Sequence, residues 1–293
     1  MSIETKPLCI YHDNCVDGFT AAWAVNRFFR ERGGCDFHAA RYGSLPPTVA
    51  GRDVIIVDFS YPADTLKLMG EMALSVLVLD HHKTAEEDLK PFAKMWPAAS
   101  AAPVVGRGEV RAYFDMHRSG AGMAWDFFMP HDKRPALVDH VEDRDLWRFM
   151  KHGTREIHAV LTSYKPSFDV WDQLNDRIEN PIQRASVIDE GEAIDRKHLL
   201  LCEEVIKAGR HEVMVEGVTV PVCNAPFHMA SDIGNIMSVG QPFAATFFIT
   251  AEGNWQYSLR SQKDGMDVSA IAKKLGGGGH RNAAGFTIKK DKR

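Results

Sequence analysis

An acidic side chain and two imidazole side chains directly follow an apolar run in the segment Val76-Leu77-Val78-Leu79-Asp80-His81-His82. The run is short, rich in β-branched residues and apolar at every position, which is typical of a strand covered on both faces. Similar runs occur at Leu8-Cys9-Ile10-Tyr11 and at Val54-Ile55-Ile56-Val57. Strands of this kind belong to parallel sheets with helices on each side, so the three runs predict such a sheet.

Helical patterns separate these runs and continue beyond them. Residues 19–32 and 63–72 carry helical patterns between successive strands, and this alternation is typical of a doubly wound α/β fold. Further helices are expected at residues 120–129 and 135–149. The segment Arg118-Ser119-Gly120-Ala121-Gly122 is interpreted as an ordinary helix start rather than a phosphate site. Residues 97–108, rich in Ala, Pro and Gly, are expected to form a surface loop.

The pattern changes after a long predicted helix at residues 186–208, which has Gly209 as its stop. Beyond it, short segments predict strands at 212–215, 218–223, 243–250, 255–260 and 285–289, with one helix at 270–275. We therefore expect a doubly wound, mainly parallel α/β domain at residues 1–185, a helical linker at 186–209 and a smaller α+β domain at 210–293.

The overall composition limits the classes of function. The 293 residues carry a formal net charge of −4 at pH 7, which argues against coating a long duplex but leaves open a short oligonucleotide held in a local pocket. No run approaches the roughly 18 apolar residues of a membrane-spanning helix. Residues 1–7 lack the features of a secretion signal. The five cysteines are odd in number and widely spread, which predicts reduced thiols in a cytoplasm.

Side chains with metal-binding chemistry follow all three predicted strands. His12 and Asp17 come after the first, Asp58 after the second, and Asp80-His81-His82 after the third. Ligands of open α/β sheets bind at the carboxyl ends of the strands. One such acid alone would be best explained as a helix N-cap. Three strand ends with two adjacent histidines instead favour divalent cations, and the mixed donors suit Mn²⁺, Fe²⁺, Co²⁺ or Zn²⁺ better than Ca²⁺.

Five ordered motifs resemble those of the DHH/DHHA1 phosphoesterases, the oligoribonuclease and RecJ-like superfamily. They are Tyr11-His12 through Gly18, Val57-Asp58-Phe59, Asp80-His81-His82, Val141-Glu142-Asp143-Arg144-Asp145-Leu146-Trp147, and Gly276-Gly277-Gly278-Gly279-His280-Arg281-Asn282-Ala283-Ala284-Gly285-Phe286. The resemblance covers nearly the whole chain. It implies a metal-binding DHH domain, a substrate-binding DHHA1 domain and an active site between the two.

The resemblance also implies residue roles in a Mn²⁺-dependent enzyme with two ions, with Mg²⁺, Co²⁺ or another divalent ion as alternatives. The matching positions give a set of metal ligands: His12, Asp17, Asp58, His81 and Asp145. Asp58 would bridge the ions and act in catalysis. His82 would be both catalytic and substrate-binding, because it would donate a hydrogen bond to the scissile phosphate.

The first and fourth motifs leave alternatives open. In the first, Cys15 and Val16 occupy the region where a carboxylate is expected, so Asn14 and Asp13 are the nearby substitutes. Cys15 itself is interpreted as a bystander rather than as a metal ligand or an oxidation-sensitive thiol. In the fourth motif, Asp143 is the alternative to Asp145. The spacing from Asp145 to Phe149 matches the family pattern, so Asp145 is preferred.

The glycine run of the second domain predicts a phosphate-binding segment. Glycines such as Gly278 and Gly279 let backbone amides approach a phosphate closely. The neighbouring His280 and Arg281, with Arg260 behind them, are the expected substrate-binding side chains, since guanidinium groups bind phosphate well. A flexible turn between a helix and the last strand is the alternative interpretation.

These observations predict an enzyme that hydrolyses phosphoester bonds of a nucleotide or a short single-stranded oligonucleotide with metal-activated water. Non-nucleotide and cyclic phosphates remain alternative substrates. A nucleic-acid-binding module with an inactive metal site is the alternative from another class. No membrane partner is expected, and a homodimer is left open.

Overall fold

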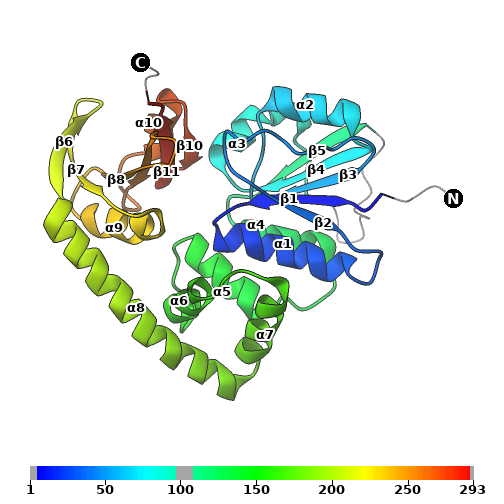
Figure 1. Ribbon diagram of the computed structural model, residues 1–293, viewed down its shortest axis with the longest axis horizontal. Helices are drawn as coiled ribbons and strands as arrows, with labels where there is room; N and C mark the ends of the chain where they lie inside the picture. Colours follow the sequence, from blue (N-terminus) through cyan, green and yellow to red (C-terminus); the bar gives the residue numbers. More distant parts are fainter. Residues whose placement is uncertain (1–4, 97–107, 291–293) are drawn as a thin grey trace. The chain divides into compact units, whose positions relative to one another are not determined.

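The chain divides into two compact units, Met1–Asp195 and Arg196–Arg293 (Figure 1). The computed structural model describes residues 5–96 and 108–290, and each unit is described by itself. The loop expected at 97–108 lies outside the described residues except for Gly108. Among the described residues, no helix is both long enough and apolar enough to cross a bilayer.

Five parallel strands form the sheet of the first unit, in the order β2-β1-β3-β4-β5. Their bounds are β1 Leu8–His12, β2 Asp36–Ala40, β3 Asp53–Val57, β4 Ser75–Asp80 and β5 Glu109–Phe114. The chain passes from β1 to β2 on one side and then returns to β3 on the other side of β1. This reversal of strand order is where open α/β sheets bind ligands. The carboxyl ends of β1 and β3 therefore mark the position for a site.

Helices cover both faces of this sheet (Figure 1). The helices of this unit are α1 Val16–Phe29, α2 Ala63–Met72, α3 Lys83–Asp88, the 3₁₀ helix η1 Lys90–Phe92, α4 Gly120–Phe128, α5 Ala136–Asp145, α6 Thr154–Ser163 and α7 Phe168–Glu179. Of these, α5 packs against α1 and α4, and α6 and α7 pack against α5. Strand side chains alternate between the faces. Accordingly, Ile55 and Val57 pack in a core with α1 and α4, whereas Val54 and Ile56 pack with α2. The doubly wound parallel α/β fold is thereby confirmed.

Two strands of this sheet were not expected from the sequence. Both β2 and β5 lie at the edges of the sheet. Their residues, Asp-Phe-His-Ala-Ala and Glu-Val-Arg-Ala-Tyr-Phe, mix polar and apolar side chains because an edge strand is less completely covered than a central one. A search for continuous apolar runs therefore finds only the three central strands.

The helix expected at 135–149 ends earlier, because α5 stops at Asp145. The chain then turns back, and the Asp143 carboxylate accepts hydrogen bonds from the backbone N–H groups of Met150 and Lys151, at 2.9 and 3.0 Å. This turn places Trp147 and Phe149 in the left-handed region, with φ of 54° and 49°. A local hydrogen-bond network thus ends the helix where helical periodicity alone would extend it.

One long helix, α8 Pro181–Gly209, contains the boundary between the two units, after Asp195. It begins five residues before the segment expected from the sequence. Its later part packs within the second unit, where His198 Nε2 lies 3.0 Å from Asp232 Oδ2.

The second unit is built on a six-stranded sheet, in the order β10-β11-β9-β8-β7-β6. Its elements are β6 His211–Val215, β7 Val218–Asn224, the 3₁₀ helix η2 Phe227–Met229, α9 Ala230–Met237, β8 Ala244–Ile249, β9 Trp255–Arg260, α10 Val268–Lys274, β10 Gly278–His280 and β11 Ala283–Ile288. Among the described strands of this second sheet, only β7 and β8 pair in parallel. The predicted α+β class of this smaller domain is confirmed.

The glycine run forms part of this sheet. Gly278–His280 is strand β10, which pairs antiparallel with β11, whereas a flexible turn was the alternative interpretation of the glycine run. A Cβ on Gly277 would overlap the carbonyl oxygen of Gly285, and one on Gly279 would overlap that of Ala283. These two glycines are therefore needed for the close approach of the two backbones. We call β10, β11 and the preceding Gly276-Gly277 the glycine hairpin.

Candidate metal centre

Strand ends position the first members of the site. His12 is the last residue of β1, Asp58 directly follows β3, and His81 directly follows β4. Asp17 lies in the first turn of α1, and Asp145 is the last residue of α5. The tertiary structure brings these five side chains together at one edge of the parallel sheet. We call them the acid–histidine cluster.

Asp58 is the centre of this cluster. Its side chain is only 2% exposed, and its Oδ1 lies 3.0 Å from His81 Nε2 while its Oδ2 lies 3.5 Å from His12 Nδ1. The backbone of Asp58 has φ of 54°, a strained conformation for a residue other than glycine. This conformation turns the chain out of β3, so that the Asp58 carboxylate contacts one histidine at the end of each neighbouring strand.

Asp17 and Asp145 complete the cluster from two helices. His81 Nε2 lies 3.7 Å from Asp17 Oδ2 and 3.7 Å from Asp145 Oδ2. The Asp17 side chain is buried, whereas that of Asp145 is 27% exposed. Three carboxylates, from the residue after β3, from α1 and from α5, therefore surround one imidazole nitrogen. Asp145 is the one of the three that is partly exposed to solvent.

The amino terminus of α4 holds Asp17 in place. Asp17 Oδ2 accepts a hydrogen bond of 2.6 Å from the N–H of Gly120, and Asp17 Oδ1 accepts one of 3.0 Å from Ala121. Ser119 caps the same helix by accepting a bond from the N–H of Gly122. This is an ordinary helix start, as the sequence indicated, and it also orients a carboxylate of the cluster.

Two glycines allow the elements to approach this closely. A Cβ on Gly120 would overlap the Cα and Cβ of Asp58. A Cβ on Gly18 would overlap the backbone oxygen and Cβ of His12. Both helices can therefore reach the strand ends only with glycine at these positions. Neither glycine's role was recognisable from the sequence, because both roles depend on contacts between distant segments.

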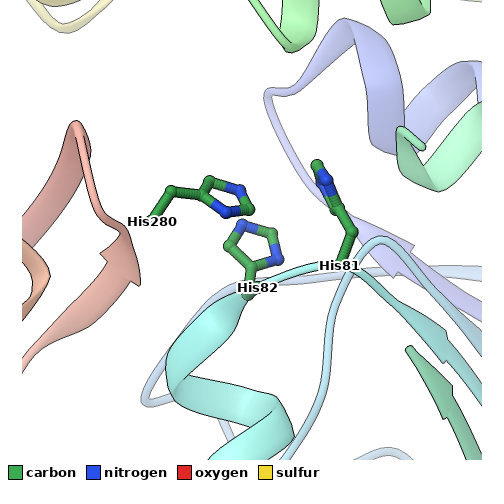
Figure 2. A group of neighbouring side chains, drawn as sticks. All are labelled: His81, His82 and His280. Carbon is green, nitrogen blue, oxygen red and sulfur yellow. The ribbon is translucent and has the colours of Figure 1, made fainter. Parts of the chain in front are cut away.

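His82 is oriented by Asp80. Its Nδ1 lies 2.7 Å from Asp80 Oδ1, which also accepts bonds from the backbone N–H groups of His81 and His82. Figure 2 shows His81 and His82 as successive side chains after β4, with ring centroids 4.9 Å apart and an interplanar angle of 65°. Asp80 is buried, and its pKa is lowered because His82 outweighs the effect of burial. The Asp80 carboxylate therefore orients His82, because it is the acceptor for the ring nitrogen Nδ1 of His82.

Charge interactions within the cluster shift the pKa values of its members. Burial alone would lower the pKa of His81, but the hydrogen bond with Asp58 and the charges of Asp145, Asp58 and Asp17 raise it to about 10. The pKa of Asp58 falls well below its usual value, since the contacts with His12 and His81 outweigh burial. Burial, with the negative charges of Asp58 and Asp145, raises the pKa of Asp17.

The donor atoms fit divalent cations. Asp58 Oδ2 and His12 Nδ1 are buried and face each other, yet among the described residues neither has a hydrogen-bond partner. Among the groups of donor atoms that lie within 4.8 Å of one another, two contain at least two members of the cluster: Asp17 with Asp58 and His81, and His12 with Cys15 and Asp58. Asp58 belongs to both of these groups, and also to a third group with Asp80 and His82. Bound cations would neutralise the clustered carboxylates, whose burial is otherwise costly.

The structure places the alternative ligands Asp13, Asn14 and Asp143 in other surroundings. Asp13 Oδ2 accepts a hydrogen bond of 2.8 Å from Arg41 Nε, and Asp13 Oδ1 accepts one from the N–H of Asn14. Asn14 lies in the turn after β1 with φ of 57°. Asp143 accepts bonds from Thr154 Oγ1 and from the loop after α5. Asp13 and Asp143 therefore have local structural partners away from the cluster.

The structure adds Tyr42 to the surroundings of the cluster. Its ring lies 5.4 Å from that of His12 and 5.9 Å from that of His82, measured between centroids, and the residue is 54% exposed. Tyr42 follows β2, which was not recognised as a strand. The rule that examines residues after each strand would have found it, had the edge strand been expected.

The expected substrate-binding residues of the second unit are partly engaged in local contacts. Gly278, Gly279 and His280 form β10. Arg260 donates hydrogen bonds to Ser231 Oγ and to the carbonyl oxygen of Leu259. The Arg281 side chain is 56% exposed and donates to the carbonyl oxygen of Gly265 at 3.2 Å. Arg281 is thus the more accessible of the two arginines.

Two relatives are similar to most of this chain. Uncharacterized protein R106 of Acanthamoeba polyphaga mimivirus is 28% identical over 302 residues, covering 95% of this chain and 66% of the relative. Oligoribonuclease NrnB of Bacillus subtilis (strain 168) is 34% identical over 230 residues, covering 73% of this chain and 53% of the relative. The chain thus spans from about half to just under two thirds of the length of these relatives.

Solved structures share the fold. A DHH domain from a protein described as a member of a family of ribosomal proteins has a TM-score of 0.56 at 12% identity, covering 97% of this chain and 83% of its own. RecJ in complex with Mn²⁺, from Thermus thermophilus, has a TM-score of 0.50 at 14% identity, covering 97% of this chain and 50% of its own. Residues 227–293 match the DHHA1 domain. With the sequence similarity to NrnB, this match shows that the chain belongs to the DHH/DHHA1 family.

Proposed function

We propose that this chain is a metal-dependent phosphoesterase that acts on a nucleotide or a short oligonucleotide. The observation that carries the proposal is the position of Asp58, which belongs to two groups of metal-binding side chains at one sheet edge. A carboxylate shared by two ligand sets is what a two-metal phosphoesterase requires. The NrnB relative, named an oligoribonuclease, supports this class of substrate.

In this proposal His12, Asp17, Asp58, His81 and Asp145 would hold the divalent ions, and Asp58 would contribute to both sites. When bound, divalent ions lower the pKa of a coordinated water and stabilise charge on the attacking and leaving oxygens. Mn²⁺ is the proposed ion, since the RecJ structure with the same fold is a Mn²⁺ complex. Mixed nitrogen and oxygen donors are compatible with Mn²⁺ and with Co²⁺.

His82 is the proposed hydrogen-bond donor to the phosphoryl group. Its Nδ1 is committed to Asp80, so it would act through Nε2. A donor held in place by a buried carboxylate needs little reorganisation when negative charge develops on the phosphoryl oxygen. Asp80 therefore acts as a positioning residue, and Asp58 and His82 are the side chains that would act on the substrate.

The second unit is proposed to contribute phosphate-binding groups. Arg281 is exposed and carries a guanidinium that can pair with phosphate. His280 and the amides of Gly278 and Gly279 lie next to it on the glycine hairpin. Arg260 would act less directly, because it is bonded to Ser231.

All five cysteines are free, which supports a reducing compartment such as the cytoplasm.

A metal-dependent activity screen tests this proposal. The full chain, freed of metal and then loaded with Mn²⁺, would be incubated with short oligonucleotides, nucleoside bisphosphates, cyclic dinucleotides and pyrophosphate, with bound metal measured in parallel. We expect two equivalents of metal and the fastest hydrolysis with a short oligonucleotide or a nucleotide. Exclusive cleavage of pyrophosphate would overturn the substrate class. Protein that binds no divalent ion and cleaves none of these would instead be a binding module.

A further inference from the structure

Cys15 lies within one of the two groups of metal-binding side chains. It is the N-cap residue of α1, in the turn that follows β1. Its Sγ, one ring nitrogen of His12 and one carboxylate oxygen of Asp58 all lie within 4.8 Å of one another. The thiol therefore stands where a third donor would complete a site with His12 and Asp58, at the place in the sequence where the family resemblance leads one to expect a carboxylate.

A second observation points to a ligand at the same place. Asp58 Oδ2 belongs to a side chain that is 2% exposed, lies 3.5 Å from His12 Nδ1, and has no hydrogen-bond partner among the described residues. A buried carboxylate oxygen without a partner is costly unless a cation or another donor satisfies it. The Asp13 carboxylate does not supply an alternative donor, because it is bonded to Arg41.

We propose that Cys15 is a metal ligand, and that it makes the site formed with His12 and Asp58 selective for a softer ion than the neighbouring site. This inference rests on the proposed metal-dependent function. It replaces the interpretation of Cys15 as a bystander.

The two sites differ in donor chemistry. The site of Asp17, Asp58 and His81 offers two carboxylates and one imidazole, a set that accepts Mn²⁺ or Mg²⁺ readily. The site of His12, Cys15 and Asp58 replaces one carboxylate with sulfur. Thiolate donors favour Zn²⁺, Fe²⁺ and Co²⁺ over Mn²⁺ and Mg²⁺. Coordination releases the thiol proton to solvent, because the thiolate is the form that binds metals.

Cobalt spectroscopy of the full chain tests the proposal without measuring activity. Metal-free protein would be titrated with Co²⁺ beyond two equivalents while the near-ultraviolet and visible spectra are recorded. We expect a thiolate-to-cobalt charge-transfer band in the wild-type protein and in Cys35→Ser. Cys35 is the matched control because it directly precedes β2. The first residue of β2 pairs with Leu8, the first residue of β1, so Cys35 lies at the end of the strands opposite the metal-binding side chains. The band should disappear in Cys15→Ser.

Competition between metals gives a second readout. Cys15→Ser should lower the affinity for Zn²⁺ by more than about tenfold, the smallest loss usual even for a supporting side chain of a metal site. Cys15→Asp should retain Mn²⁺ binding and lose the preference for Zn²⁺, because it restores an oxygen donor. Folding of each variant would be checked by its unfolding temperature without metal.

The outcomes separate the two proposals. Cobalt that binds and shows only ligand-field bands, with no thiolate band, would overturn the role of Cys15 while leaving the metal-dependent function intact. A band that persists in Cys15→Ser would also overturn it. Failure of the wild-type protein to bind any Co²⁺ would refute both proposals.

Discussion

The acid–histidine cluster of the first unit and the glycine hairpin of the second both contain residues of the family motifs. The two regions differ in the physical reason that these residues are needed. In the cluster, three carboxylates surround one imidazole nitrogen, and Asp58 Oδ2 has no hydrogen-bond partner among the described residues. In the hairpin, Gly277 and Gly279 are needed for backbone packing, and Arg260 of the neighbouring strand β9 is bonded to Ser231.

The difference shows where this chain carries unsatisfied interactions. The hairpin residues pack closely against one another, so their identity follows from the packing of the sheet. The cluster instead concentrates buried negative charge that the protein alone balances incompletely, and it holds Asp58 in a strained backbone conformation with φ of 54°. Costs of this kind are typical of functional sites. The predictions below test this contrast, in order of decreasing effect.

The largest effect is expected for Asp58→Ala. Loss of the carboxylate shared by both ligand groups should lower phosphoester hydrolysis by about a thousandfold or more, since metal-dependent charge stabilisation contributes several kcal/mol. Steady-state kinetics and metal content would be measured on the Mn²⁺-loaded protein. Asp13→Ala is the matched control, because its carboxylate is bonded to Arg41 outside the cluster. Near-normal turnover of Asp58→Ala would refute the two-metal proposal.

Asp145→Asn and Asp143→Asn compare two acids of the same helix. Asp145→Asn should reduce metal affinity and activity by about 100-fold. It should cause no loss of thermal stability, because burial and repulsion from Asp58, which raise the pKa of Asp145, both disfavour its charged form. Asp143→Asn should instead destabilise the fold by about 2 kcal/mol, because it weakens bonds to Met150, Lys151 and Thr154. The reverse pattern in metal titrations and urea unfolding would exchange their roles.

Gly120→Ala and Gly277→Ala compare close packing in the two units. Each added methyl group would overlap backbone or Cβ atoms, of Asp58 in the first case and of Gly285 and Phe286 in the second. Each should cost about 1–3 kcal/mol of stability. Only Gly120→Ala should also weaken metal binding, as measured by calorimetry, because it displaces a ligand. Equal metal affinity in both variants would contradict this assignment.

Arg281→Ala should have a smaller effect, a rise in KM of about tenfold with little change in kcat, because a charged hydrogen bond to a bound phosphate is lost in both ground and transition state. Arg210→Ala is the control, since Arg210 is also a half-exposed arginine of the second unit and pairs with Glu212. A decrease in kcat at constant KM would show that Arg281 acts in another way.

The smallest effect concerns pH. Burial, together with Lys151 and Arg184, lowers the pKa of His140 from 6.5 to about 4. The unfolded chain therefore takes up a proton below pH 6.5 that the folded protein excludes. The contribution of His140 to the free energy of unfolding should be fully present above pH 6.5. It should fall by about 1 kcal/mol over the first pH unit below that value. His140→Gln should remove this dependence in unfolding experiments.

His81 shows the opposite sign, and the two histidines can be distinguished in metal-free protein. Its folded pKa of about 10 lies above the ordinary 6.5. Its contribution to stability is therefore fully present below pH 6.5 and is lost as pH rises toward 10. Alkaline loss of stability that persists in His81→Gln would show that another group is responsible.

Much of the first unit could be predicted from the sequence. The central strands were recognisable from continuous apolar runs, and the rule that ligands bind at carboxyl strand ends singled out His12, Asp58 and His81. The edge strands β2 and β5 were not recognisable, because partial exposure allows polar residues in them. Tyr42 was missed for the same reason, since it follows β2. The end of α5 was placed too late, because the bonds that stop it come from Asp143.

The chemical inventory of this protein, the central strands of its first unit and the helices between them follow from local patterns, since burial on both faces and helical periodicity are properties of short segments. Which acids share a site does not. Asp143 and Asp145 are two residues apart, yet one contacts the loop after α5 and the other contacts His81. Likewise, Asp13 pairs with Arg41 while Cys15 lies beside His12 and Asp58. Those partnerships depend on how distant segments pack, because electrostatic and hydrogen-bond contacts act over a few ångströms in space and not along the chain.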